Sequence, residues 1–159
     1  MTVTVRAATP DDVALIYRFI RDLADYEKLA HAVEASEADI ARDLFGPTPR
    51  VFADIAEADG APAGFALWFY SYSTFRGRHG IYLEDLFVRE EARGRGAGKA
   101  LLQGLARRCV QEGLARLEWA VLDWNAPSIA FYDSLGAAAL DDWITRRLDG
   151  EALAQLARG

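Results

Sequence analysis

The pattern of apolar and polar positions along the chain predicts an alternation of strands and helices. Apolar residues that recur every third or fourth position, as at Val13, Ile16, Ile20 and Leu23, are typical of a helix with one buried face. Runs that alternate, or short apolar runs between turn residues, are typical of strands. The predicted strands lie at 3–5, 50–57, 63–72, 81–88, 117–122 and 143–148, and the predicted helices at 10–23, 36–46, 100–112, 127–135 and 151–156. This order predicts an α/β fold, with a mixed central sheet and helices on both faces.

Composition indicates an ordinary globular protein. The 159 residues are 52% apolar, so we expect one domain over 1–159 with a proper core. The apolar stretch at 65–69 is too short to span a bilayer, and residues 1–20 lack the layout of a signal peptide. A single cysteine, Cys109, excludes an intrachain disulfide. We therefore expect a cytoplasmic protein that makes no use of a membrane.

The net charge and the positions of His and Cys limit the kinds of partner that we expect. The net charge of −6 disfavours nucleic acid and favours a cationic partner. His31, His79 and Cys109 are too scattered to suggest a metal site, so we expect no metal. Cys109 lies on an apolar helical stripe, which predicts a place in the core.

The most informative stretch is a loop of alternating glycines, Arg93-Gly94-Arg95-Gly96-Ala97-Gly98-Lys99, between a predicted strand and a predicted helix. Such glycines let the backbone approach a ligand closely, and the helix N-terminus behind them favours a phosphate or pyrophosphate. Two nucleotide-binding patterns do not fit. A P-loop needs glycine at position 93 and Ser or Thr at 100, and a dinucleotide fingerprint needs glycine at 99.

The loop and two further segments resemble one enzyme family. The pattern R-G-x-G-x-G after the strand 82–88 resembles the acyl-CoA-binding loop of the GCN5-related N-acetyltransferase (GNAT) superfamily. The segment 124–132 resembles the later cofactor and general-acid region of that superfamily. With Tyr26-Glu27, these motifs are similar in order and spacing to the diamine acetyltransferase branch, which includes spermidine/spermine and thialysine acetyltransferases. The resemblance covers the chain from Val3 to about Leu156.

This resemblance implies an acyltransferase that uses acetyl-CoA as co-substrate and forms homodimers. It implies direct acetyl transfer to a small primary amine, which is a diamine, a polyamine or a lysine-like amine such as thialysine. The cofactor-binding residues that it implies are Leu86, Phe87, Val88, Arg93, Gly94, Arg95, Gly96, Ala97, Gly98, Lys99, Asn125, Ala126, Pro127 and Ser128. The substrate-binding residues that it implies are Tyr26, Glu27, Glu84, Asp85, Glu118, Trp119 and Ala120.

Tyr132 and Glu84 are the predicted catalytic residues. In the matching motif the tyrosine lies beside the sulfur of CoA, and a phenol can protonate the leaving thiolate. Without the motif, Tyr132 would be interpreted as a core aromatic next to Phe131. Glu84 is predicted to bind the acceptor and act as its base, with Asp85 as a weaker second. Adjacent strand residues face opposite sides unless a bulge intervenes, so an edge-strand carboxylate held by Arg or Lys is the alternative for Glu84.

The acceptor and two other functions stay open. Ser73-Thr74-Phe75 replaces the Asp-Pro-Trp of polyamine-specific relatives, which favours a shorter diamine or lysine-like acceptor. A non-catalytic acyl-CoA-binding domain would need neither Tyr132 nor Glu84. A protein N-acetyltransferase would need an open acceptor groove.

Overall fold

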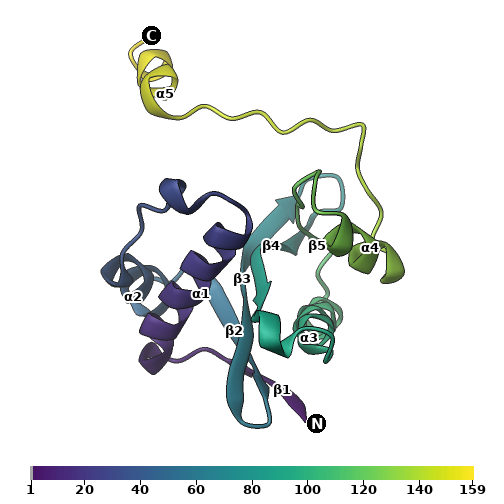
Figure 1. Cartoon of the computed structure of the whole chain (residues 1–159). Helices are drawn as coiled ribbons and strands as arrows, with labels where there is room; N and C mark the ends of the chain where they lie inside the picture. Colours follow the sequence, from purple (N-terminus) through teal and green to yellow (C-terminus); the bar gives the residue numbers. More distant parts are fainter. Residues whose placement is uncertain (1) are drawn as a thin grey trace. The chain divides into compact units, whose positions relative to one another are not determined.

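The computed structural model describes residues 2–159, which divide into two compact units, one ending at Ala120 and one spanning Val121–Gly159 (Figure 1). The strands of the first unit are β1 (Val3–Ala7), β2 (Phe52–Ala58), β3 (Ala61–Ser73), β4 (Arg78–Val88) and β5 (Leu117–Glu118). Its helices are α1 (Val13–Tyr26), α2 (Glu37–Phe45) and α3 (Ala97–Glu112), with 3-10 turns η1 (Pro10–Asp12), η2 (Ala30–Ala32) and η3 (Glu90–Ala92). The second unit contains α4 (Ala126–Ser134) and α5 (Gly150–Ala157).

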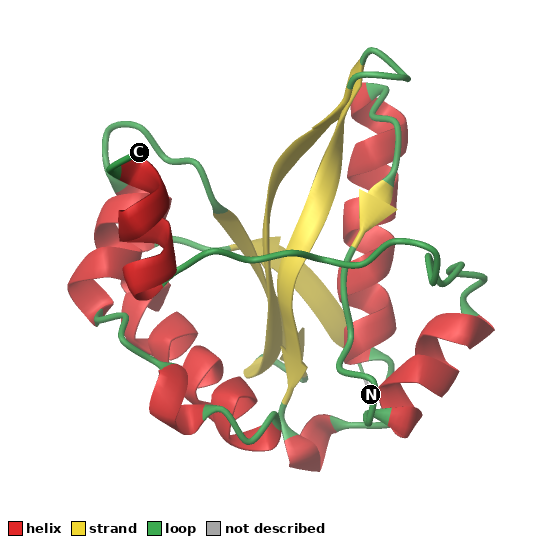
Figure 2. Cartoon of the chain, turned by 90° about the horizontal axis from the view of Figure 1, so that it is seen from above, coloured by secondary structure: helices red, strands yellow, loops and turns green. Residues whose placement is uncertain are grey.

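The sheet of the first unit has the order β1-β2-β3-β4-β5. Neighbouring strands are antiparallel except for β4 and β5, which are parallel, so the sheet is mixed as predicted. Within this unit α1 and α2 cover one face of the sheet and α3 covers the other (Figure 2). The α/β fold with helices on both faces is confirmed.

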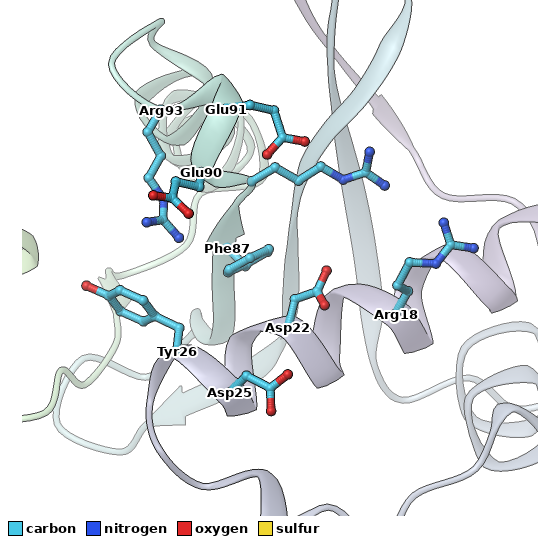
Figure 3. A pocket seen from close by; sticks show the side chains of 9 residues that line it. Arg18, Asp22, Asp25, Tyr26, Phe87, Glu90, Glu91 and Arg93 are labelled. Atoms are coloured by element: carbon cyan, nitrogen blue, oxygen red, sulfur yellow. The ribbon is translucent and has the colours of Figure 1, made fainter.

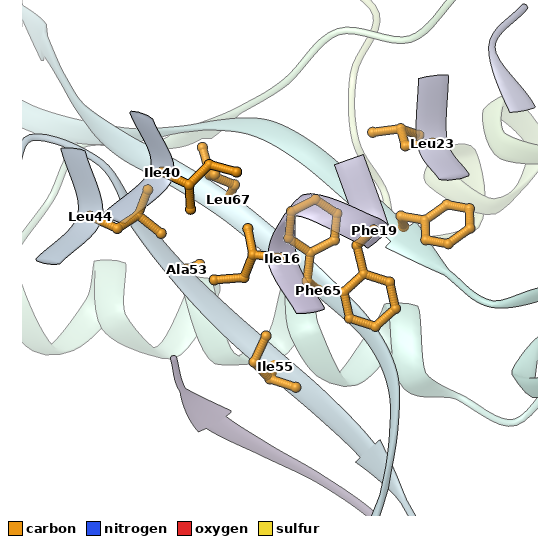
Figure 4. Close-up of a cluster of buried hydrophobic side chains, with 10 residues drawn as sticks. Ile16, Phe19, Leu23, Ile40, Leu44, Ala53, Ile55, Phe65 and Leu67 are labelled. Carbon is orange, nitrogen blue, oxygen red and sulfur yellow. The ribbon is translucent and has the colours of Figure 1, made fainter. Parts of the chain in front are cut away.

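The core between α1, α2 and the sheet fixes α1 in place (Figure 4). Ile16 and Phe19 of α1 are fully buried against Ile55 and Phe65 of the sheet. The rings of Phe19 and Phe65 stack with 5.4 Å between their centres. Each such side chain contributes about 1.5–3 kcal/mol when it is removed from water. The helix that carries Tyr26 and precedes Glu27 is therefore held firmly on β3 and β4.

Helix α3 packs on the opposite face through Leu101 and Leu105, which are fully buried, and through Cys109, whose predicted place in the core is confirmed. The helix starts three residues earlier than predicted, at Ala97, because Gly96 adopts a left-handed conformation at its N-cap. A polar backbone turn can begin a helix in this way without an apolar stripe, so the apolar pattern alone did not indicate the first turn.

Two predicted strands differ from the structure. The strand predicted at 117–122 ends at Glu118, because the parallel ladder to β4 stops at Tyr82, two residues before an irregularity in β4 at Glu84. The strand predicted at 143–148 is wrong: those residues form no strand. Trp143 and Ile144 have suitable side chains for a strand and are each 78% exposed, but a strand also needs a neighbouring edge to pair with. No helix in residues 2–159 is both long and apolar enough to cross a membrane.

Candidate active site

A β-bulge in β4 lies at Glu84. Leu67 of β3 lies opposite Asp85, and the next residue of β3, Trp68, lies opposite Leu83, so Glu84 has no partner in the ladder. A bulge of this kind bends the strand and redirects the side chains that follow it. In a regular strand, adjacent side chains point to opposite faces of the sheet. At this bulge, Glu84 and Asp85 do not have to do so.

The bulge changes which face of the sheet the odd-numbered residues of β4 occupy. Before the bulge, Leu83 lies opposite Trp68, and the centre of the Trp68 ring is 4.9 Å from the guanidinium carbon of Arg108 in α3. Leu83 therefore lies on the face of the sheet that α3 covers. After it, the ring of Phe87 lies 6.1 Å from that of Phe19 in α1. Since residues two apart share a face, Asp85 faces α1 together with Phe87.

Two carboxylates of the predicted acceptor site, Glu84 and Glu27, act on a third, Asp85. Burial, then the negative charge of Glu84, then that of Glu27 raises the pKa of Asp85 to about 7. Burial also raises the pKa of the Glu27 carboxyl, which follows α1 directly. Glu84 is exposed and Asp85 is half-buried. A carboxyl group with a pKa near 7 gains and loses its proton readily at neutral pH, as a general base must.

Glu118 of β5 belongs to the same neighbourhood. Burial, then the charges of Glu84 and Glu118, raises the pKa of the Tyr82 phenol, so both carboxylates act on one ring. Glu118 also forms an ion pair with Arg116 at 2.5 Å. Its two predicted companions, Trp119 and Ala120, directly follow β5. Glu84 is therefore common to two groups of charges, one with Glu118 around Tyr82 and one with Glu27 around Asp85.

Beyond Tyr82, the outer edge of β4 has no neighbouring strand in the described part of the chain. The Arg89 N–H donates to the Ala63 carbonyl of β3 at 2.8 Å, and N–H directions alternate along a strand. The N–H groups of Leu86 and Val88 therefore face away from β3, towards the open edge. An extended ligand can pair with such an edge much as an added strand does.

The glycine loop leaves backbone N–H groups open at the start of α3. Gly94 and Gly96 have φ angles of +76° and +88°, and a Cβ at either would meet no atom within 4 Å. Glycine is therefore needed for the backbone shape rather than for space. The N–H groups of Ala97, Gly98 and Lys99 begin α3 and lack partners within the helix. These donors fit the pyrophosphate of CoA.

Arg93 connects the loop to α1. Its Nε donates to the carbonyl oxygen of Val88 at 3.0 Å. Its guanidinium carbon lies 5.1 Å from the centre of the Tyr26 ring and 5.8 Å from that of Phe87. The structure thus brings together Tyr26, predicted at the acceptor, and Arg93, predicted at the cofactor. The side chains of Arg95 and Lys99 are exposed.

In the second unit, α4 carries the other predicted cofactor and acid residues. Asn125 is buried, and its Oδ1 accepts a hydrogen bond from the Ser128 N–H at 3.4 Å, which caps the helix. Pro127 lies in the first turn, as predicted. Tyr132 is half-buried, with its ring 5.5 Å from that of Phe131. The helix that presents Tyr132 is therefore built by the same residues that form the motif.

Ser73, which replaces an acid of polyamine-specific relatives, has a local structural role. It is buried at the end of β3, and its Oγ accepts a hydrogen bond from the Arg76 N–H at 3.1 Å. Its carbonyl accepts another from the Gly77 N–H at 2.8 Å. Phe75, at the tip of the same turn, is fully exposed. The serine hydroxyl closes the turn between β3 and β4.

A pocket of about 700 Å³ lies between the polar side of α1 and the segment that joins β4 to α3 (Figure 3). Three of its lining residues, Tyr26, Phe87 and Arg93, were predicted site residues. The others were missed by sequence reasoning: Arg18, Asp22, Asp25, Arg89, Glu90 and Glu91. The only signal in the sequence was the polar stripe at 18, 22 and 25, which looks the same as an ordinary solvated helix face.

Comparison with known proteins identifies the family. Residues 16–137 match the model of the acetyltransferase (GNAT) family. The chain is 40% identical to the thialysine N-epsilon-acetyltransferase of Bos taurus, over 98% of this chain and 97% of that protein. It is 33% identical to an L-ornithine N5-acetyltransferase of Arabidopsis thaliana, over 94% of this chain and 85% of that protein. A solved integron cassette protein from the mobile metagenome of V. cholerae is 27% identical, with a TM-score of 0.82 over 100% of this chain and 99% of that one.

The fold, the glycine loop and these matches define a GNAT-family enzyme. The chain belongs to the acetyltransferase (GNAT) family and is an N-acetyltransferase, as the sequence resemblance predicted. GNAT acetyltransferases use acetyl-CoA. The non-catalytic alternative considered from the sequence is not supported by these relatives, which are named as enzymes. Within residues 2–159, no group of three or more His, Cys, Asp or Glu side chains is arranged to hold a metal ion.

Proposed function

We propose that this protein transfers the acetyl group of acetyl-CoA directly to a primary amine of a small cationic molecule, without a covalent acetyl-enzyme. The observation that carries the proposal is the carboxylate cluster of Glu27, Glu84 and Asp85 beside the open edge of β4. A cluster of negative charge attracts an alkylammonium ion, and the open edge suits the extended arm of CoA. The relatives named as thialysine and ornithine acetyltransferases support the same class of acceptor.

The carboxylates must remove a proton before the amine can react. An alkylammonium group with a pKa near 10.4 is neutral in only about one molecule in a few thousand at pH 7. Asp85, with a pKa of about 7, accepts the proton, and Glu84 and Glu27 stabilise the approaching ammonium by their charge. The sequence predicted Glu84 as the base and Asp85 as a weaker second. The burial of Asp85 and its place on the α1 side of the bulge support Asp85 as the base and Glu84 as the acceptor ligand.

The cofactor is held by backbone groups of the first unit. Acetyl-CoA supplies an activated acetyl group as a thioester. The N–H groups of residues 97–99 bind its pyrophosphate, and the outward N–H groups of Leu86 and Val88 bind its arm and polarise the acetyl carbonyl. These roles are supported by the φ angles of Gly94 and Gly96, which leave the loop free of side chains.

Tyr132 completes the reaction by protonating the leaving thiolate. The support for this role is the motif around it, in which Asn125 caps α4 and Pro127 occupies the first turn. Asn125, Ala126, Pro127 and Ser128 keep their predicted role at the cofactor. The homodimer implied by the resemblance and the cytoplasmic location also stay predictions, which size-exclusion chromatography with light scattering and cell fractionation will test.

One assay tests the function. The purified chain is incubated with acetyl-CoA and, in separate reactions, putrescine, cadaverine, L-ornithine, L-lysine, thialysine, spermidine or spermine, and both free CoA and the N-acetyl product are measured. We expect stoichiometric CoA and acetyl-amine, with better turnover of a short diamine or a lysine-like amine than of spermine. CoA release without an acetylated amine in every reaction, or no turnover at all, would contradict the proposal. Spermine as the best substrate would contradict the predicted preference for a short acceptor but not acetyl transfer to a small amine.

A further inference from the structure

The pocket beside α1 is lined by charges of both signs (Figure 3). Asp22 and Asp25 come from α1, and Glu90 and Glu91 come from η3. Three guanidinium groups line the same space, those of Arg18, Arg89 and Arg93. A ligand that fills this pocket therefore meets both anionic and cationic groups.

Two of the three guanidinium groups are already engaged. Arg93 is bonded to the Val88 carbonyl and lies against the Tyr26 ring, and Arg89 lies 5.2 Å from the centre of the Phe19 ring. Arg18 takes part in no hydrogen bond, ion pair or ring contact within residues 2–159. Its positive charge is therefore available to a ligand.

The four carboxylates that line the pocket are likewise without ion pairs in the described part of the chain. Asp22 lies four residues after Arg18, and Asp25 lies seven residues after it, so all three follow one stripe of α1. One stripe therefore offers a guanidinium at one end and two carboxylates at the other.

This arrangement selects among the ligands of an acetyltransferase. The lining carries four carboxylates and three guanidinium groups, a net charge of −1, so it does not favour the phosphates of CoA. A diamine would place a second ammonium next to the unpaired Arg18. An α-amino acid, by contrast, has an ammonium for the carboxylates and a carboxylate for Arg18.

The pocket adjoins the carboxylate cluster along two elements. Its two rings, Tyr26 and Phe87, are next to that cluster in the chain: Tyr26 precedes Glu27, and Phe87 is two residues after Asp85 on the same face of β4. Two strand residues cover about 6.7 Å, which is close to the reach of a lysine-like side chain. The two rings provide apolar walls for the methylene groups of such a chain.

We propose that this pocket binds the α-ammonium and α-carboxylate groups of a free amino acid whose side-chain amine is the acetyl acceptor. Arg18 binds the carboxylate, and Asp22 and Asp25 bind the ammonium. The inference rests on the proposed function, because it assigns the other end of the same acceptor. It makes an ornithine- or lysine-like amino acid, rather than a diamine, the preferred substrate class.

Matched pairs of acceptors test the proposal. Decarboxylation of L-lysine gives cadaverine and decarboxylation of L-ornithine gives putrescine, so each pair differs only in the α-carboxylate. We expect kcat/KM for the better amino acid to exceed that of its diamine by about tenfold or more, as is typical for a charged hydrogen bond. Nα-acetyl-L-lysine, which lacks the α-ammonium, should also be a poorer substrate than L-lysine. A diamine that equals or exceeds its amino acid would overturn the proposal.

Variants locate the effect in the pocket. Arg18→Gln should raise the KM for the amino acid about tenfold and lower that for the diamine, whose second ammonium then no longer meets a positive charge. Asp22→Asn with Asp25→Asn should weaken the binding of both acceptors. Arg42→Gln, which removes an exposed guanidinium on α2 outside the pocket lining, is the control and should change neither. An equal loss for both acceptors in Arg18→Gln, or weaker acetyl-CoA binding in that variant, would overturn the assignment.

A binding measurement distinguishes a failure of this proposal from a failure of the proposed function. Calorimetry of L-lysine, L-ornithine and the two diamines with the intact protein requires no turnover. Tighter binding of an amino acid than of its diamine, lost in Arg18→Gln, supports the pocket even if no acetyl product forms. Equal binding of both members of each pair contradicts it even if every amine is acetylated.

Discussion

Asp85 and Glu27 come from different elements, the bulged strand β4 and the end of α1, and the negative charge of Glu27 contributes to the raised pKa of Asp85. The bulge at Glu84 makes this electrostatic interaction possible, because it places Asp85 opposite Leu67 on the α1 side of the sheet. The acceptor end of the site is therefore defined by strand register rather than by a local motif.

Replacing Asp85 changes how stability depends on pH. Its pKa is about 7 in the folded chain and 3.8 ordinarily, so the folded state binds more protons between these values. Stability therefore falls as pH rises from about 4 to 7 and stays level above. Asp85→Asn removes this loss, so at pH 8 it should be more stable than the wild type by at most about 4 kcal/mol, with a smaller gap near pH 4. Urea unfolding across pH measures the difference.

The exposed Asp43→Asn on α2 is the control for that experiment and should show no such gain at pH 8. Asp85→Asn should also lower kcat at least about tenfold, because it removes the proposed base. Unchanged pH dependence of stability would show that Asp85 is not buried as described. Unchanged kcat would exclude it as the base.

Glu84→Gln distinguishes the two candidate bases. The variant should raise the KM for the amine, because a charge that attracts the ammonium is lost. It should also shift the acidic limb of the pH–rate profile to lower pH, since the charge of Glu84 helps to raise the pKa of Asp85. Steady-state kinetics from pH 5 to 9 measure both effects. A shift of that limb to higher pH would instead identify Glu84 as the base.

Gly96→Val should weaken acetyl-CoA binding by at least about tenfold while the fold survives. The valine side chain would stand in the loop that accepts the pyrophosphate, and φ at +88° adds about 1–2 kcal/mol of strain. Gly60→Val is a close control, because Gly60 has φ at +82° and equally open space in the β2–β3 turn. Calorimetry should show weaker binding in the first variant only. If Gly96→Val and Gly60→Val both fold and bind acetyl-CoA with equal affinity, the pyrophosphate does not bind to this loop.

Tyr132→Phe should lower kcat at least about tenfold and leave the affinity for acetyl-CoA unchanged. The substitution keeps the ring next to Phe131 and removes only the proton donor, whose effect is typically about 100- to 10,000-fold. Tyr17→Phe on α1 removes a hydroxyl that accepts from Arg21 at the surface and serves as the control. Full activity of Tyr132→Phe at every pH would show that Tyr132 is a packing aromatic and not the general acid.

Local signals in the sequence were sufficient for much of this structure. The glycine loop was predictable because alternating glycines before an apolar helix stripe determine a backbone shape by themselves, as the φ angles of Gly94 and Gly96 show. The stripe at Ile16 and Leu23 predicted the buried face of α1 for the same reason, since side-chain spacing on a helix is local.

The remaining features depend on partners that are distant in the chain. The bulge at Glu84 results from the register of β4 on Leu67 and Trp68, and no residue of β4 marks it. The residues at 143–148 have suitable side chains for a strand but form none, because strand formation also depends on pairing that the side-chain pattern does not encode. The polar residues at 18, 22 and 25 line a pocket because the end of β4 and the segment that follows it lie opposite them.

The open edge of β4 makes two backbone positions natural reporters of cofactor occupancy. The amides of Asp85 and Phe87 point towards β3 and should exchange their hydrogens slowly whether or not acetyl-CoA is present. The amides of Leu86 and Val88 point the other way, so they should exchange rapidly in the free protein and slow down when an extended ligand pairs with them. Alternate residues of a single strand thus record, in one exchange experiment, the stability of the sheet and the occupancy of the site.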